Sequence, residues 1–218
     1  MTDQTRYTAR LHNLLRQALA DIPTQLRGGI YAVSLYFHCE DDDDRYPCVG
    51  FSYNTESRCR EQAAQASSPA EARWNYAYWL QEDAPAWRII GGENDADLAA
   101  WFAASPHYYG EEENQAAFED DGDEAFATVS AKGDAFCAEF VEAVIAAVQK
   151  LFAENAVADT FGRDIPVLVH ELEYYDLPNG WTKRANPPGV ADEFLAWAQN
   201  GGYGGEDEDE DARDTDYR

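Results

Sequence analysis

The sequence predicts an α+β domain in which helices pack on a mostly antiparallel central sheet. Two segments with the alternation of β-strands, 30–39 and 46–54, are separated only by a short acidic segment. Two longer segments, 3–21 and 135–154, carry apolar residues at helical spacing. Strands and helices do not alternate regularly, which argues against a parallel βαβ sheet. With 218 residues, 45% of them hydrophobic, the chain has enough apolar material for a single domain over 1–200.

The two strands are predicted to form an antiparallel hairpin at the centre of the sheet. Pro47 has no amide hydrogen, so it fits the beginning of the second strand. Five successive carboxylates, 40–44, lie between the strands and form a solvated turn, because unpaired charges are costly to bury. One face of the first strand is predicted to be wholly apolar and to point into the core: Tyr31, Val33, Leu35 and Phe37.

Two long helices are predicted to cover the sheet. The first has Thr2 or Asp3 as its N-cap and ends before Pro23. The second has Asp134 as its N-cap and ends near Asn155. Its apolar stripe, spaced at 3.6 residues, consists of Phe136, Phe140, Val141, Val144, Ile145, Val148, Leu151 and Phe152.

Shorter elements fill the rest of the domain, separated by Gly, Pro and Ser residues. In chain order they are a helix capped by Thr55, a short helix or irregular turn leading into an extended piece over 69–81, a strand over 87–90, a helix from Asn94 or Asp95 to Pro106, a strand over 165–175 and a helix over 190–199.

Negative charge is the most unusual property of the chain, which has a formal net charge of -26. Three segments hold half of the 42 acidic residues: five in the turn 40–44, eight in an insertion over about 107–127 and eight in a tail over 201–218. Their composition predicts that the insertion lies on the surface outside the core and that the tail is disordered. The negative electrostatic field of the chain repels nucleic acid and anionic membranes. If the three segments converge on one side, they attract a basic protein partner. The alternative is that the acidic segments only keep the protein solvated.

The cysteines do not form a metal-binding motif. Cys39, Cys48, Cys59 and Cys137 show no CxxC or Cys/His spacing, so no zinc site and no cofactor is expected. A disulfide between Cys39 and Cys48 across the hairpin is a minor alternative. No export signal and no apolar run long enough to span a membrane is visible, which favours the cytoplasm.

Three groups of residues are candidates for a partner-binding site. The acidic turn lacks the spacing of an EF-hand calcium loop, so it is a candidate for a basic partner rather than for calcium. An Arg followed by aromatic residues is typical of interface hot spots but equally of a core. Two carboxylates on one strand face are candidates for acid–base chemistry, with His170 on the opposite face. The candidates are Asp41, Asp42, Asp43, Asp44, Arg73, Trp74, Tyr76, Trp79, Glu171 and Glu173.

The order helix, strand pair IYAVSLYF…YPCVGFSYNTE and segment EARWNYAYWL resembles an uncharacterised bacterial family, a domain of unknown function. The resemblance covers residues 7–200 and is most specific at the YNTE turn 53–56 and at Arg73, Trp74 and Trp79. It brings no catalytic residues. Members of that family are loosely similar, in size and acidity, to immunity proteins that neutralise secreted bacterial toxins.

These observations favour a non-enzymatic, acidic, cytoplasmic binding protein, of the immunity type, that covers a basic toxin or nuclease. The alternatives are a small metal-dependent or acid–base hydrolase using His170, Glu171, Glu173 or the acidic turn, and a regulatory or structural module without a dedicated small-molecule site. The sequence leaves the oligomeric state open.

Overall fold

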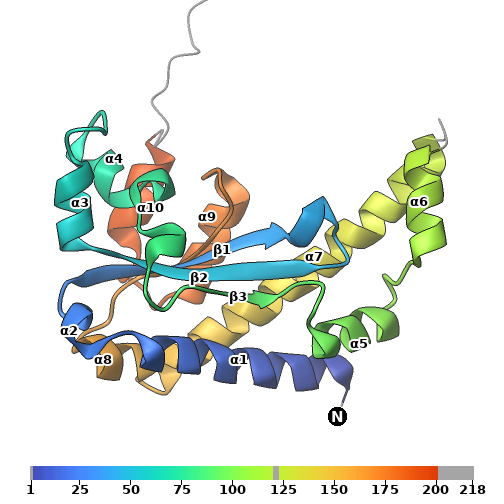
Figure 1. Ribbon diagram of the computed structural model, residues 1–218, viewed down its shortest axis with the longest axis horizontal. Helices are drawn as coiled ribbons and strands as arrows, with labels where there is room; N and C mark the ends of the chain where they lie inside the picture. The colour runs from blue at the N-terminus through green and yellow to red at the C-terminus, as the bar shows by residue number, and fades with distance from the viewer. Residues whose placement is uncertain (1, 120–122, 201–218) are drawn as a thin grey trace, which may run out of the picture.

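The computed structural model describes residues 2–119 and 123–200 and forms one α+β domain (Figure 1). Its four-stranded sheet has the order β3-β2-β1-β4. The strands are β1 (Ile30–Cys39), β2 (Pro47–Thr55), β3 (Arg88–Gly91) and β4 (Val167–His170). The central hairpin of β1 and β2 is confirmed as antiparallel, with Leu35 opposite Phe51.

A register shift between Ile30 and Ala32 corrects one detail of the predicted hairpin. The extra residue of such a bulge reverses the side to which the side chains point. Tyr31 was expected on the same face as Val33, yet it packs on the opposite face of the sheet with Trp74 and Trp79. The strict alternation of side chains between the two faces therefore fails at the beginning of β1.

The sheet is mixed, so the prediction of a mostly antiparallel sheet was wrong. β1 pairs with β2 antiparallel but with β4 in parallel, with Val33 opposite Val167. The long helix α7 (Asp123–Ala153) and the short helix α8 (Ala156–Phe161) return the chain to the beginning of β1 before β4 starts. A connection of this length is what a parallel pairing requires.

β4 ends at His170, five residues earlier than predicted, and the chain then bends into α9 (Asp176–Ala185). The sequence did not indicate this helix because it contains Pro178 and Gly180. Pro178 lies in the first turn, where a missing amide hydrogen costs little. Because 171–175 is not a strand, Glu171 and Glu173 do not share a strand face as predicted.

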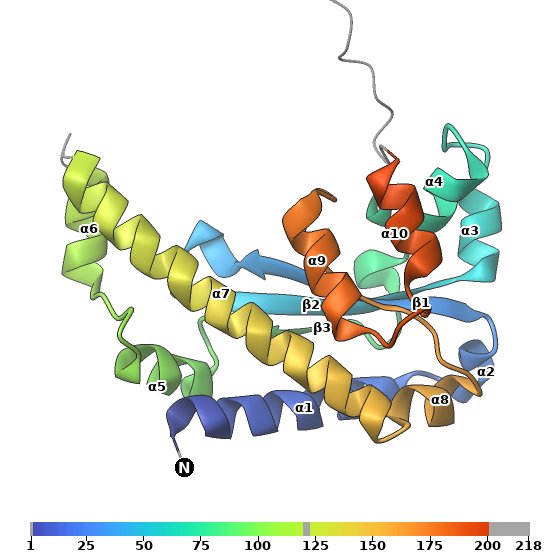
Figure 2. The ribbon, with the colours of Figure 1, turned by 180° about the vertical axis from the view of Figure 1, so that it is seen from behind.

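One side of the sheet is covered by α7, which runs diagonally across it, and by α1 (Asp3–Asp21), as predicted (Figure 2). The Thr2 hydroxyl accepts a hydrogen bond from the amide of Thr5 and so caps α1. α5 (Ala96–Ala104), capped by Asp95, packs beside α1. The apolar stripe of α7 lies in this core, with Phe136 and Phe140 fully buried.

The acidic insertion is helical rather than an irregular surface segment. It contains α6 (Glu111–Glu119), and α7 already begins at Asp123, so Asp134 lies inside a helix and is not its cap. Tyr109 and Ala117 are buried and belong to the main core, contrary to the expectation that the insertion lies outside it. Part of the insertion, 120–122, lies outside the described residues, as does the tail 201–218.

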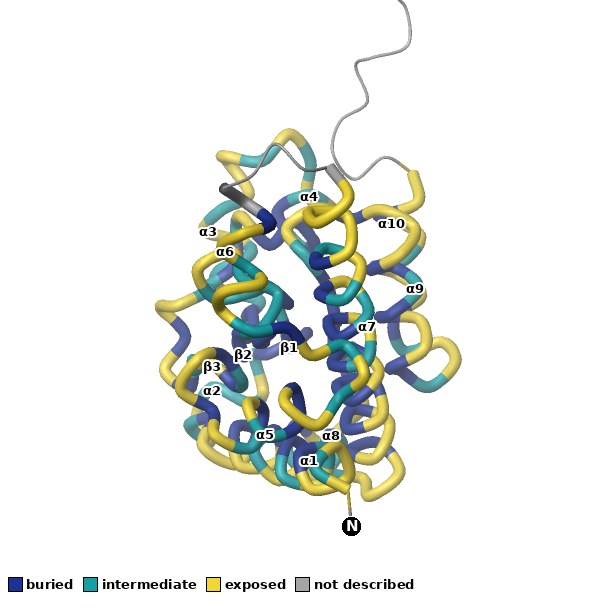
Figure 3. The backbone as a smooth tube through the Cα atoms, turned by 90° about the vertical axis from the view of Figure 1, so that its right-hand side faces the viewer, coloured by how far each residue is buried: buried dark blue, intermediate teal, exposed yellow. Residues whose placement is uncertain are grey.

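The other side of the sheet carries a second, smaller core. It is built by α3 (Glu56–Gln62), α4 (Pro69–Trp74), the 3-10 turn 76–78 and α10 (Asp192–Gln199). A second 3-10 turn, 81–83, follows Trp79 along the chain. α2 (Thr24–Arg27) joins α1 to the sheet. Figure 3 shows buried residues along the strands and the inner sides of the helices, with exposed residues around them. Within the described ranges, no helix combines the length and apolar character needed to cross a membrane.

Candidate functional site

The acidic turn 40–44 has a defined backbone conformation. Asp41 and Asp42 adopt left-handed backbone angles, with φ of 55° and 56°, which Asp tolerates better than most residues. The amide of Glu40 donates to the carbonyl oxygen of Tyr46 at 3.1 Å, and the amide of Tyr46 donates to that of Asp43 at 2.9 Å. The backbone of the turn therefore has a defined course.

Arg45 joins the acidic turn to the acidic insertion. Its guanidinium forms a bidentate pair with Asp43 and an ion pair with Glu111 at 2.6 Å. It also lies over the rings of Tyr46 and Tyr109, at 5.3 and 6.0 Å from their centroids. The Arg45 side chain is only 10% exposed, so its positive charge is engaged by groups of the protein itself. Two of the three predicted acidic segments thus meet at one end of the molecule (Figure 1).

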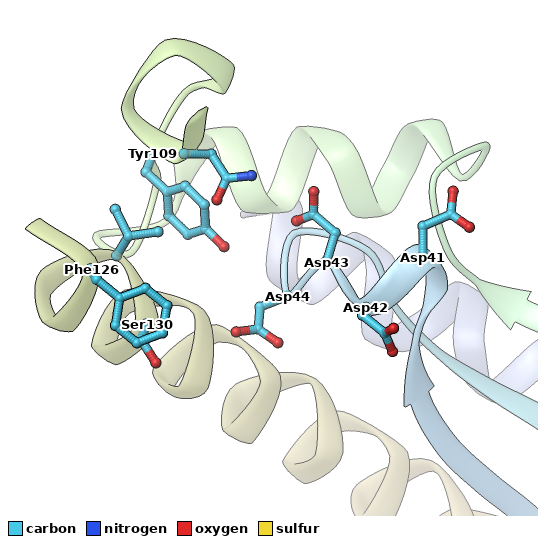
Figure 4. Close-up of a pocket in the computed structure, with 9 residues that line it drawn as sticks. Asp41, Asp42, Asp43, Asp44, Tyr109, Phe126 and Ser130 are labelled. Carbon is cyan, nitrogen blue, oxygen red and sulfur yellow. The ribbon is translucent and has the colours of Figure 1, made fainter. Parts of the chain in front are cut away.

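An open pocket of about 370 Å³ lies between the turn and the insertion. Figure 4 shows the carboxylates on the turn and the rings of Tyr109 and Phe126 on the side of the insertion and α7. The pocket is lined by Asp41, Asp42, Asp43, Asp44, Tyr109, Asn114, Phe126, Val129 and Ser130. It combines all four predicted acidic residues of the turn with aromatic residues that the sequence did not single out.

Asp44 is the innermost of these carboxylates and rests against Gly133 of α7. A Cβ atom added to Gly133 would lie 2.4 Å from Oδ2 and 2.6 Å from Cβ of Asp44. Burial raises the pKa of Asp44, and the nearby carboxylates of Asp134 and Asp43 add to this increase. The absence of a side chain at Gly133 therefore creates the space in which the turn docks on the helix.

Replacing Gly133 by alanine is expected to destabilise the protein by about 1–3 kcal/mol, because the added methyl group displaces Asp44. Helix propensity alone predicts the opposite, a gain of about 1 kcal/mol. The free energy of unfolding, measured by urea denaturation, distinguishes the two. Gly180→Ala in α9 is the control, since its added Cβ meets no atom within 4 Å. Equal stabilisation by both substitutions would contradict the close contact.

Asp44 also contacts two cysteines that are 98 positions apart from each other in the sequence. Sγ of Cys39 lies 3.5 Å from Oδ1 of Asp44 and 3.5 Å from Sγ of Cys137. The sequence gave no signal for this cluster, because Cys137 stands alone on α7. The minor alternative of a Cys39–Cys48 disulfide is wrong: the thiol of Cys48 lies beside Nε2 of His38 at 3.2 Å, and both cysteines are free. Cys39 and Cys48 point to opposite faces, since Cys48 pairs with His38.

The aromatic candidates belong to the second core and not to a docking surface. Trp74, Tyr76 and Trp79 are buried. The Trp79 indole donates to the carbonyl oxygen of Arg73 at 2.9 Å. The Arg73 guanidinium lies 4.0 Å from the ring centroid of Tyr31 and pairs with Glu56 at 3.0 Å. Of the two interpretations of this segment, the structure bears out the core, and these three aromatic residues are not exposed for docking.

Glu171 and Glu173 lie on the bend after β4, along a shallow hollow that they share with Leu172 and Tyr175. Glu171 accepts a hydrogen bond from the Tyr175 hydroxyl at 2.7 Å, and this contact raises the pKa of Tyr175 to about 12. Neither glutamate lines the pocket at the acidic turn. The structure therefore separates them from the other acidic candidates.

His170 is buried and pairs with a serine. Its Nε2 lies 2.8 Å from Oγ of Ser34, and its Nδ1 donates to the carbonyl oxygen of Glu171 at 2.7 Å. Ser34 is 0% and His170 1% exposed, so this Ser–His pair offers no access to a substrate. Burial lowers the pKa of His170 to about 4. The pair acts as a buried polar link between β1 and β4.

No protein-family model, no curated protein and no solved structure matches the chain. The resemblance to an uncharacterised bacterial family and to immunity proteins remains a prediction.

Proposed function

We propose that the protein is a non-enzymatic binding protein whose acidic end takes a basic segment of a protein partner. The observation that carries this proposal is the pocket that the four aspartates of the turn line together with Tyr109 and Phe126. In Figure 4 the carboxylate of Asp44 points towards the side of these two rings, and Asp41 and Asp42 lie at the outer end of the turn. Long cationic side chains fit such a site, because their aliphatic part packs on aromatic rings while their charged end meets carboxylates.

Charge balance at the pocket supports a cationic ligand. Within 2–119 and 123–200, no Lys or Arg pairs with Asp41, Asp42 or Asp44. Arg45 is already neutralised by Asp43 and Glu111. Excess negative charge at a concave surface accelerates the approach of basic molecules and favours their binding.

Exposed aromatic residues beside the carboxylates support a macromolecular partner. Phe126, which lines the pocket, is 46% exposed, and Tyr108, near the beginning of the insertion, is 51% exposed. Large exposed aromatic side chains are typical anchors of protein interfaces. In this proposal they serve as the aromatic anchors of the interface, a role for which Trp74 and Trp79 were the candidates in the sequence. An immunity-type protein that covers a basic toxin or nuclease in the cytoplasm is the form of this function that the resemblance favours.

The test is a titration with a lysine- and arginine-rich peptide, followed by amide chemical shifts at low and high salt. Binding is expected to shift the amides of 40–46, 109–119 and 124–133 and to weaken as salt is added. Asp41→Asn/Asp42→Asn is expected to weaken binding roughly five- to tenfold, which corresponds to about 1 kcal/mol.

Glu82→Gln/Asp83→Asn is the matched control, since it removes two adjacent exposed carboxylates that lie outside the pocket. Phe126→Ala is expected to weaken binding while leaving the net charge unchanged. Shifts spread evenly over the acidic surface would contradict a defined site. Equal losses in the two double variants would reduce the interaction to net charge alone.

A further inference from the structure

We propose that Cys39, Asp44 and Cys137 form a binding site for a thiophilic divalent cation of the zinc class. The three residues come from the end of β1, the acidic turn and the middle of α7. One potential ligand atom from each lies within 4.8 Å of the other two. This proposal does not depend on the proposed function: Asp44 also lines the open pocket, but neither the three ligands nor their test requires a basic partner.

Two of the three distances within the cluster are close to those of a metal site, and the third is below 4.8 Å. Zinc bonds of about 2.3 Å to sulfur and 2.0–2.2 Å to carboxylate oxygen place tetrahedral ligand atoms roughly 3.6–3.8 Å apart. The Cys39 thiol lies 3.5 Å from both the Cys137 thiol and Oδ1 of Asp44. A cation can therefore enter with only small movements of the three side chains.

The supporting structure holds these side chains before any ion arrives. Asp44 is seated against Gly133, one turn of α7 before Cys137. Sγ of Cys137 also lies 3.6 Å from the carbonyl oxygen of Asp44, so the turn and the helix approach each other at this point. A site built on packed secondary structure and fixed by close contacts is preorganised for its ligand.

The electrostatic surroundings favour a cation. The carboxylates of Asp43 and Asp134 act on Asp44 with the same sign of charge. In the described part of the chain, no Lys or Arg forms an ion pair with Asp44. A bound dication would offset this concentration of partly buried acidic groups, which otherwise costs free energy.

The chemistry of the ligands selects the kind of metal. Two thiolates favour zinc and other thiophilic ions over calcium and magnesium, which prefer oxygen ligands. Three protein ligands leave one tetrahedral position for water or another small ligand. Of the three ligands, Asp44 also lines the pocket, so the site borders the pocket on one side.

Cobalt(II) titration of the reduced protein tests the site directly, because thiolate–cobalt bonds give a charge-transfer absorption that other ligands lack. We expect saturation at one equivalent, loss of the absorption on adding zinc, and its absence in Cys137→Ser. Asp44→Asn is expected to weaken binding about tenfold or more. Cys59→Ser, which removes the thiol of α3, is the matched control and should behave like the wild type.

A second measurement needs no substitution in the cluster. Zinc is expected to protect Cys39 and Cys137 of the wild type from alkylation while Cys59 continues to react, as read by peptide mass spectrometry. At a hundredfold excess over Kd, zinc should also raise the Tm by roughly 5–10 °C.

The proposal is overturned if the reduced wild type gives no charge-transfer band with excess cobalt. It is also overturned if the band survives in Cys137→Ser and disappears in Cys48→Ser, which would assign the metal to the neighbouring pair of His38 and Cys48. Should the reduced thiols form a Cys39–Cys137 disulfide in the presence of zinc and air, the pair would be a redox couple instead of a metal site.

Discussion

Replacing Trp79 by alanine is expected to lower the free energy of unfolding by about 3–5 kcal/mol, the range for deleting a large aromatic side chain from a core. Trp79 is 2% exposed and packs edge-to-face with Tyr31 and tilted against Tyr76, with centroid distances of 5.8 and 6.1 Å. Its indole also donates a hydrogen bond to the carbonyl oxygen of Arg73. Urea denaturation followed by fluorescence measures the loss.

Trp197→Ala is the matched control, because Trp197 packs on the same core from α10 but is only partly buried. Its loss is expected to be about half as large. The comparison also separates the two roles considered for the aromatic segment: a docking residue would leave stability nearly unchanged and weaken partner binding. A Trp79→Ala protein of wild-type stability would show that the second core does not depend on this ring.

Elements that depend on local pattern could be predicted from the sequence. The hairpin of β1 and β2 and the helix α1 follow from alternation, helical periodicity and a capping threonine. The parallel pairing of β4 with β1 could not be predicted, because it depends on where α7 and α8 end relative to β1. The helix α9 was missed because Pro178 and Gly180 lower helix propensity, which tertiary packing of Trp181 on Phe37 overrides.

The candidate site shows the same division. The solvated turn was predicted from its five successive acids, and Asp41 and Asp42 are indeed exposed, but Asp43 and Asp44 are partly buried against Arg45 and Gly133. The meeting of the turn with α6 depends on one cation, Arg45, whose two carboxylate partners are 2 and 66 positions away. Gly133 and Cys137 carried no local signal, because their roles arise only when α7 crosses the end of β1.

The aromatic segment illustrates what composition alone leaves open. Arg73 and Trp74 followed by two tyrosines and Trp79 read equally well as an interface or a core. A short helix and a 3-10 turn curl this segment so that its rings point back onto the sheet. The bulge in β1 then turns the Tyr31 ring to meet them.

The stability of the protein is expected to fall by about 3 kcal/mol through His170 alone as the pH drops from 7 towards 4. Burial lowers the pKa of His170 to about 4 in the folded protein, against 6.5 for an exposed histidine. Between these two values the unfolded chain binds a proton that the folded protein does not. The contribution is therefore fully present above pH 6.5 and is lost as the pH falls towards 4.

The surroundings of His170 explain why its imidazole is not protonated in the folded protein. Nδ1 carries the hydrogen that it donates to the carbonyl oxygen of Glu171, so Nε2 is the acceptor for the Ser34 hydroxyl. The imidazole is surrounded by the rings of Tyr36, Tyr76 and Tyr174. None of these neighbours supplies a negative charge that could stabilise an imidazolium ion.

His170→Gln tests this account, since glutamine keeps a polar side chain that accepts from Ser34 but does not titrate. The difference in unfolding free energy between wild type and His170→Gln should shrink by about 3 kcal/mol between pH 7 and pH 4, whereas contributions of the carboxylates cancel because both proteins share them. Ser34→Ala retains the buried imidazole and should keep the wild-type pH dependence. Parallel curves for wild type and His170→Gln would mean that the folded protein accommodates the imidazolium, and that acid acts on its stability through the carboxylates instead.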